Sequence, residues 1–284
     1  DLGKIRELWE KSLTLYEKLK DNSGIADQLG QLAWLHINEG NFAEAMKNLK
    51  KALSISKKLE DKEEIAGVLR KISAVLEQKG DYNKSLEYQI KAKEIYSQIG
   101  NKFFEAITLR SIGMKYEKIG KLDKAMEYFL AGYKINQTDQ SNIINNNSWW
   151  FESNIGVILF KKKNYSDAIE FLNKSLSNSL GSDKQTAELH TEAISNLYLC
   201  LAQKKMNLDF NLKKIDSILK YAYKQNEMEL LFLLYKLTED SKHLVKSYLL
   251  LQEKIKNVRN KRNTFINYPL HKKIAKEYKK YFND

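Results

Sequence analysis

The sequence predicts an all-α fold, an α-solenoid built from stacked helical hairpins. Three observations predict it: a block of 40 residues recurs without gaps, apolar residues recur every three or four positions inside each block, and a glycine divides each block in two. The composition agrees with this fold. A chain of 284 residues with 12 glycines and one proline is neither collagen-like nor a fold built on Pro/Gly turns.

The repeat is defined by columns of matching residues. Gly40, Gly80 and Gly120 share one column, and each is followed two positions later by Phe42, Tyr82 or Leu122. The column of Ala52, Ala92 and Gly132 is small throughout. Apolar spacing on both sides of the glycine predicts two amphipathic helices, and the glycine supplies the left-handed backbone that ends the first one. Such a hairpin cannot bury its apolar face alone, so neighbouring hairpins must stack.

The repeat extends in both directions from these blocks. We expect a half repeat at 1–24, repeats at 25–64, 65–104, 105–147 and 148–187, and a degenerate repeat at 188–225, which together form a solenoid over 1–225. A C-terminal helical pair or cap is expected at 226–262, and a basic tail helix at 263–284 that Pro269 ends or separates. The polar stretch 139–147 is expected to be a loop. The opening half repeat favours a piece of a longer protein.

These columns resemble the tetratricopeptide repeat (TPR), in the 40-residue variant found in kinesin light chain and in bacterial and archaeal sensor proteins. The chain lacks the proline that the family places near the end of the second helix, and a longer second helix replaces that stop. The resemblance implies a right-handed superhelix whose first helices line a concave groove. It also implies a non-catalytic scaffold that binds a protein or peptide segment, as the sensor or regulatory region of a larger signalling protein with an effector domain.

The resemblance also implies which residues face that groove. The positions are Gln31, Trp34, Arg70, Lys71, Arg110, Trp150, Asn154 and Asn196. In the family, Asn at the position that Asn154 and Asn196 occupy here holds a peptide backbone, because an amide offers both a donor and an acceptor. Arg or Lys nearby grips carboxylates, Arg through its bidentate fork. Two alternatives stay open: Asn154 and Asn196 bridging helices, and Trp34 packing in the core.

The sequence contains no catalytic constellation. The four histidines lie far apart without metal-ligand spacing, and there is no GxGxxG or Walker loop. Cys200 lies in the apolar run 197–201, which favours an inert buried thiol, and His36 shares a column with apolar residues. We therefore expect no enzyme, no metal and no cofactor. One cysteine and no apolar run of about 20 residues favour a cytoplasmic protein.

The charge is concentrated near the C-terminus. The net charge is +12, and the last 84 residues carry 19 basic and 9 acidic side chains, or +10 of that total. A basic tail attracts phosphate backbones and anionic surfaces. The alternative function is therefore nucleic-acid or anionic-surface binding through Arg259, Lys261, Arg262, Lys272 and Lys273. A solvated helix face explains the same lysines equally well.

Overall fold

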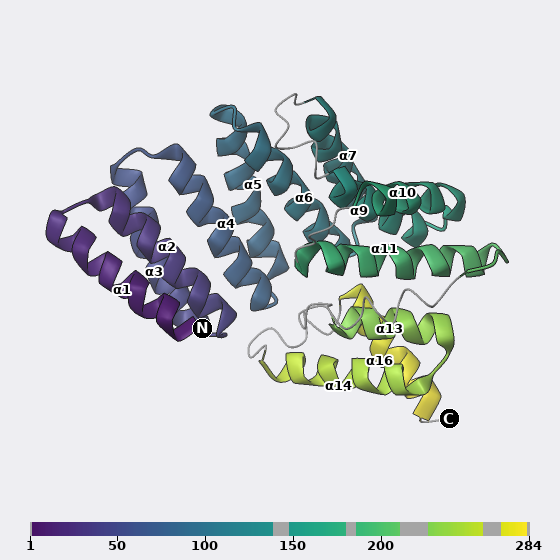
Figure 1. Ribbon diagram of the computed structural model, residues 1–284. Helices are drawn as coiled ribbons and strands as arrows, with labels where there is room; N and C mark the ends of the chain where they lie inside the picture. Colours follow the sequence, from purple (N-terminus) through teal and green to yellow (C-terminus); the bar gives the residue numbers. More distant parts are fainter. Residues whose placement is uncertain (1, 139–147, 180–185, 211–226, 258–267, 283–284) are drawn as a thin grey trace. The chain divides into compact units, whose positions relative to one another are not determined.

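The computed structural model describes residues 2–138, 148–179, 186–210, 227–257 and 268–282, and within these ranges all regular structure is helical (Figure 1). The helices are α1 (Leu2–Leu19), α2 (Asn22–Asn38), α3 (Phe42–Lys58), α4 (Lys62–Gln78), α5 (Tyr82–Gln98), α6 (Lys102–Lys118), α7 (Leu122–Thr138), α9 (Ser148–Lys161), α10 (Tyr165–Asn178), α11 (Thr186–Lys205), α13 (Glu227–Thr238), α14 (Ser241–Asn257) and α16 (Pro269–Phe282). The prediction of an all-α helical-repeat solenoid is confirmed.

The turn inside each hairpin is set by the glycine column. Gly40, Gly80 and Gly120 have φ values of 75°, 73° and 84°, which confirms the predicted left-handed backbone. The residue after each glycine donates its N–H to the carbonyl five residues back, as Asn41 does to His36 at 2.7 Å. In the next hairpin Lys163 takes this conformation with φ 67°. A side chain therefore occupies a backbone position that favours glycine.

The turn between consecutive hairpins is equally regular. One or two residues after each of these second helices the backbone is left-handed, with φ values of 58° for Lys20, 56° for Glu60 and 73° for Gly100. The next residue caps the following helix: side-chain oxygens of Asp21, Asp61 and Asn101 accept hydrogen bonds from the N–H groups of Gly24, Glu64 and Phe104 at 3.0, 3.0 and 3.2 Å. This capping column recurs every 40 residues.

Small residues let the two helices of each hairpin cross closely. Ala33 and Ala45 are completely buried where α2 meets α3. At the matching crossing of α4 and α5, the hydroxyl of Ser73 donates to the carbonyl of Ser85 at 2.8 Å, and the hydroxyl of Ser85 donates to the carbonyl of Ser73 at 2.7 Å. These reciprocal bonds satisfy both buried hydroxyl groups. The crossing therefore tolerates serine where the previous hairpin has alanine.

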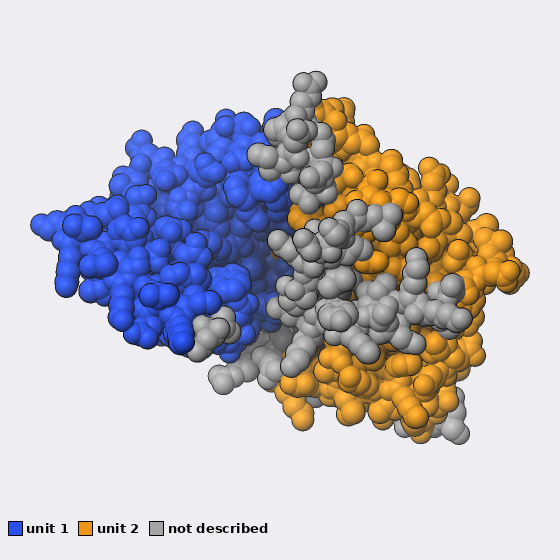
Figure 2. Space-filling view, in the orientation of Figure 1, with its two compact units in different colours: residues 1–112 blue, residues 113–284 orange. Residues whose placement is uncertain are grey.

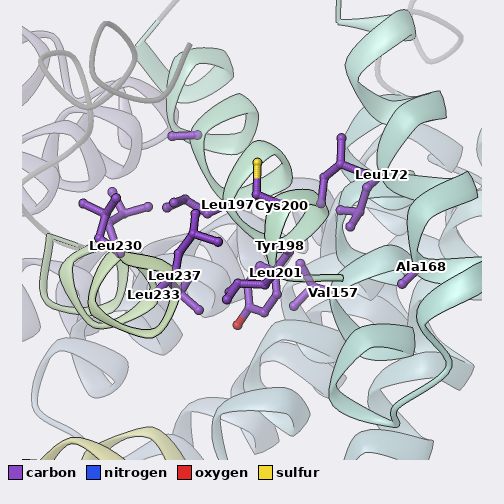
Figure 3. Close-up of a cluster of buried hydrophobic side chains, with 13 residues drawn as sticks. Val157, Ala168, Leu172, Leu197, Tyr198, Cys200, Leu201, Leu230, Leu233 and Leu237 are labelled. Carbon is purple, nitrogen blue, oxygen red and sulfur yellow. The ribbon is translucent and has the colours of Figure 1, made fainter. Parts of the chain in front are cut away.

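The chain divides into two compact units, residues 1–112 and residues 113–284 (Figure 2). The core of unit 1 lies between α2, α3 and α4 and includes Leu29, Leu49 and Ile72. In unit 2, α11 contributes Leu197, Cys200 and Leu201 to a cluster that also holds Leu172 of α10 and Leu230 of α13 (Figure 3). Each unit therefore has its own apolar core.

The structure also reports on several residues that the sequence singled out. Cys200 is a buried free thiol, as predicted. Trp149 and Phe151 are buried while Trp150 is partly exposed, so these adjacent aromatic residues are not buried alike. His36 is half-buried, and its Nδ1 lies 3.8 Å from the carboxylate of Glu39.

Candidate functional site

The candidate site of unit 1 is the side of its first helices that carries the predicted groove positions. We call it the first-helix face and define it by Asp27, Gln31 and Trp34 of α2, Glu64, Arg70 and Lys71 of α4, and Arg110 of α6. On α2 the three residues are spaced by four and three positions, so they share one side of the helix. Glu64 and Lys71 are seven positions apart and share one side of α4.

Charged side chains bridge α2 and α4 on this face. The ammonium group of Lys71 reaches across to Gly30, where a Cβ atom would lie only 2.5 Å from Nζ, so Gly30 leaves the space that this ammonium occupies. The Nε2 of Gln31 donates a long hydrogen bond of 3.4 Å to Asp27. Burial raises the pKa of Glu64, the nearby charge of Lys71 opposes this rise, and Asp27 adds to it. The face therefore combines an acidic and a basic group at short range.

The two predicted arginines of unit 1 make contacts within the protein. The guanidinium carbon of Arg70 lies 5.1 Å from the centroid of the Phe104 ring, which itself stacks on Tyr96 with centroids 5.2 Å apart. Burial raises the pKa of Tyr96, and the neighbouring Arg70 works against that rise. Arg110 is partly buried on α6. Arg70 thus has a packing role that the sequence did not reveal.

Trp34 is the large apolar side chain of the first-helix face. Its surface is 48% exposed, although it lies in the middle of the protein's first hairpin. Its ring meets that of Trp9 of α1 edge to face, with centroids 6.4 Å apart. Of the two alternatives for Trp34, this exposure favours projection over core packing. Aromatic side chains held in this way are typical anchors of protein interfaces.

In unit 2 the corresponding side of the first helices is engaged by the unit's own residues. Lys161 lies seven residues after Asn154 on α9, and it forms ion pairs with Glu117 of α6 at 2.5 Å and Glu229 of α13 at 3.9 Å. The ring of Tyr198 of α11 lies 5.6 Å from its ammonium nitrogen. Burial alone would lower the pKa of Lys161, but the charge of Glu117 and the neighbouring Tyr198 and Glu229 raise it well above the usual lysine value.

The predicted asparagines of unit 2 are held against their own helices. The amide nitrogen of Asn154 donates to the carbonyl of Trp150, and that of Asn196 donates to the carbonyl of Glu192 at 2.9 Å. Both bonds span four residues, so these amide nitrogens bond within a helix rather than between helices. Trp150 itself is partly exposed.

The predicted basic tail is described in part. Lys272 and Lys273 are exposed on α16, which buries His271 and Ile274 on its other side. Burial of part of the side chain and the charges of Lys161 and Lys236 lower the pKa of Lys273. Arg259, Lys261 and Arg262 lie outside the described residues.

Among the residues that the structure describes, no three His, Cys, Asp or Glu side chains gather as a metal site would require. No helix within the same ranges is both long enough and apolar enough to cross a membrane.

Comparisons with known proteins agree with this architecture. Family models described as tetratricopeptide repeat match residues 64–138, and residues 29–59 and 153–179. The search of the curated proteins gives no match. Among solved structures, the chain is similar to BtubC from P. vanneervenii, at 17% identity over 77% of this chain and 88% of that one, with a TM-score of 0.63.

Two other solved structures extend the likeness. A Rap protein complexed with Competence and Sporulation Factor is 15% identical over 96% of this chain and 67% of that one, with a TM-score of 0.60. A signal-transduction ATPase (STAND) with a tetratricopeptide repeat sensor, from Pyrococcus horikoshii, is 18% identical over 97% of this chain and 40% of that one, with a TM-score of 0.59. At these identities the likeness concerns the fold.

The hairpins, their crossings and their turns define this protein as a helical-repeat protein. The family matches make the class specific: the chain contains tetratricopeptide repeats, matched at residues 29–59, 64–138 and 153–179.

Proposed function

We propose that the chain is a non-catalytic scaffold that binds an extended or helical peptide segment on the first-helix face of unit 1. The observation that carries this proposal is Trp34, a tryptophan 48% exposed on the same side of α2 as Gln31. Exposure of a large aromatic ring to water is unfavourable in the unbound protein. Such a ring is typical of the anchor residues of protein interfaces. Gln31 and Lys71 supply amide and ammonium groups beside it, which suit a peptide backbone and a carboxylate.

The known relatives support a regulatory version of this proposal. One neighbour is described as a complex with Competence and Sporulation Factor, and the repeats of another are described as a sensor. By analogy, we infer a sensor region of a larger signalling protein whose partner is a protein or peptide, with an effector domain on the same longer chain. The single cysteine is a buried free thiol, so the chain needs no oxidising compartment, and we assign this work to the cytoplasm.

A displayed library of random 16-residue peptides tests the proposal. Peptides enriched on the wild-type chain should lose at least about tenfold in affinity for a variant that combines Gln31→Ala, Trp34→Ala and Lys71→Ala, because hot-spot tryptophans contribute most of the binding free energy at interfaces. The matched control combines Lys47→Ala, Lys50→Ala and Ser54→Ala, all exposed on α3. Equal binding of the enriched peptides to both variants would refute the site.

A second candidate function rests on α16. Its five lysines, Lys272, Lys273, Lys276, Lys279 and Lys280, are all exposed. Binding of a polyanion there should fall steeply with salt, because each phosphate contact releases counterions. The test is a mobility shift with a single-stranded oligonucleotide at low salt, for the wild-type chain and a variant with these five lysines changed to glutamine. A shift that the variant retains, or no shift at all, argues against this function.

A further inference from the structure

The solvent side of α3 carries a row of lysines around one serine. We call this row the lysine stripe and define it by Lys47, Lys50, Lys51, Ser54, Lys57 and Lys58. All six side chains are exposed, whereas the opposite side of the helix packs in the core of unit 1. The four lysines closest in sequence to Ser54 are three or four positions away from it, so they are its neighbours on the helix surface.

Three of these lysines have no acidic partner. Lys47 pairs with a glutamate of its own helix at 3.2 Å, and Lys51 pairs with Glu17 of α1 at 3.3 Å. Within the part of the chain that the structure describes, the side chains of Lys50, Lys57 and Lys58 form no ion pair. Lys47 also lies three and four positions from two other lysines, and like charges at this spacing destabilise a helix. The stripe therefore presents positive charge that the described chain does not neutralise.

The matching positions of the other second helices do not carry this charge. In α1 they hold three glutamates and two lysines, in α5 two glutamates and one lysine, and in α7 one glutamate and one lysine. On α5 these residues are Glu87, Ile90, Lys91, Glu94, Ser97 and Gln98. The five lysines are therefore a property of α3, and the repeat does not require them.

The helix beside α3 limits the width of a partner. Leu53 of α3 and Tyr88 of α5 pack in the same apolar clusters, so the two helices are neighbours. Glu87 and Glu94 of α5 are exposed at positions that match the stripe. A broad anionic surface, such as a lipid bilayer or a nucleic-acid duplex, would meet these carboxylates as well and be repelled by them. A partner that is one chain wide can contact the lysines alone.

The stripe also lacks the side chains that single-stranded nucleic acids use. Proteins that bind single strands combine positive charge with aromatic rings on which the bases stack. The stripe consists of lysine and serine only. A carboxylate needs no stacking surface, and the pair of Lys51 with Glu17 shows that a lysine of the stripe accepts a carboxylate from another helix. These observations favour an acidic polypeptide over a nucleic-acid strand.

We propose that the lysine stripe of α3 docks an acidic segment of a partner polypeptide. Glu or Asp side chains of that segment pair with Lys50, Lys57 and Lys58, and the hydroxyl of Ser54 donates a hydrogen bond to a carboxylate between them. The stripe is about 16 Å long, which equals about three turns of a partner helix. It lies on a different helix from the first-helix face, so it stands independently of the function proposed above.

Three probes test the class of partner. The first is a 16-residue peptide with glutamates at helical spacing, the second has glutamines in their place, and the third is an oligothymidylate of eight nucleotides. Fluorescence anisotropy at low salt measures their binding to the full chain. We expect the glutamate peptide to bind at least about tenfold more tightly than the glutamine peptide. Its affinity should fall as salt rises, because salt screens exposed charges.

A triple variant locates the binding on α3. Lys50→Gln, Lys57→Gln and Lys58→Gln together should weaken the glutamate peptide at least about tenfold, because they remove the three lysines that have no partner within the described chain. All three side chains are exposed, so circular dichroism should report an intact fold.

Two controls separate the stripe from other effects. Lys79→Gln, Lys84→Gln and Lys121→Gln together lower the net charge equally at exposed lysines outside the stripe, and most of the affinity should remain. The alanine variant of the first-helix face should bind the glutamate peptide as the wild-type chain does. In the library experiment above, peptides that bind the stripe would instead lose affinity for the α3 control variant, so the two sites give opposite results.

Three results would overturn the proposal. The first is equal binding of the glutamate and glutamine peptides by the wild-type chain, or binding of neither. The second is full binding by the stripe variant, or an equal loss in the charge-matched control, which would assign the effect to net charge. The third is tighter binding of the oligonucleotide than of the glutamate peptide, lost in the stripe variant, since the occupant would then be a nucleic acid.

Discussion

Lys161 of α9 and Glu117 of α6 form an ion pair across 44 residues of sequence, in a part of unit 2 where both side chains are largely buried. The ammonium group also lies near Glu229 and the ring of Tyr198. Removing two charges from water costs free energy unless the two charges form an ion pair with each other. The pair therefore links the first helices of successive hairpins on the side that, in unit 1, presents Trp34 and Lys71.

We expect Glu117→Gln to lower the free energy of unfolding by about 1–3 kcal/mol, because it leaves Lys161 with only the longer contact to Glu229 in a partly dry site. Urea unfolding measures the change. The control is Glu7→Gln, which breaks the highly exposed pair with Lys11 and should change stability by less than about 0.5 kcal/mol. Since the folded-state pKa of Lys161 is raised, its stabilising effect should persist at neutral pH and disappear only above the ordinary lysine value of 10.5. Equal losses in both variants would contradict this account.

The charge of Glu64 should destabilise the folded state, whereas the charge of Lys161 stabilises it. Burial raises its folded-state pKa, so its ionised form opposes folding at neutral pH and the opposition ends as pH falls below the ordinary value of 4.5. We expect Glu64→Gln to raise the free energy of unfolding at pH 7, by at most about 1 kcal/mol because the side chain is partly exposed and screened. Urea unfolding at pH 7 and near pH 3 should show a gain at the first pH only. A loss of stability at pH 7 would mean that its attraction to Lys71 outweighs burial.

Two helix glycines should respond oppositely to alanine. A Cβ atom at Gly113 would lie 2.6 Å from the completely buried ring of Phe129, so Gly113→Ala should cost about 1–3 kcal/mol through overpacking. At Gly67 the nearest side-chain atom to such a Cβ is a carboxylate oxygen of Glu64, at 3.8 Å, which is an ordinary van der Waals distance. Gly67→Ala should therefore stabilise α4 by about 0.5–1 kcal/mol. Thermal unfolding of the two variants distinguishes them. Unchanged or increased stability of Gly113→Ala would show that the helix crossing does not depend on this glycine.

Lys163 is the position where glycine should improve the protein. It stands in the left-handed conformation that Gly40 adopts in the first hairpin. Lys163→Gly should therefore raise the free energy of unfolding by about 0.5–1 kcal/mol. Glycine removes the strain of a side chain in the left-handed conformation, and the greater conformational entropy of glycine in the unfolded state offsets part of this gain. Gly40→Ala is the reciprocal control. No atom lies within 4 Å of the new Cβ, so the stability that this variant loses measures the backbone strain alone. Denaturant midpoints of both proteins give the comparison.

Much of the fold could be predicted because its determinants are local. The glycine column dictated a left-handed turn at Gly40, Gly80 and Gly120, and the structure has it there. The same logic was available for the caps at Asp21, Asp61 and Asn101, whose 40-residue spacing is visible in the sequence. Lys163 was harder to recognise, because a shift of 43 residues separates it from Gly120 and lysine gives no signal of a left-handed backbone.

The candidate site was less predictable, because a residue's position in the repeat does not tell which neighbours it meets. Arg70 was expected to meet a partner's carboxylate, and the structure places its guanidinium over Phe104. Lys161 was not singled out at all, although it lies two turns beyond Asn154 on α9. Its distance of seven residues from a predicted groove position is the signal that could have identified it.

The hairpin, its period and its turns follow from the amino-acid sequence, since they depend on backbone conformations that each block specifies within its own residues. The packing of segments distant in sequence determines that Trp34 is half exposed while Trp149 is buried, and that Lys161 pairs with Glu117. The exposure of a side chain and its ion pairs depend on neighbours that come from distant parts of the chain. A repeat pattern gives the position of a side chain on its helix, but it does not specify those neighbours.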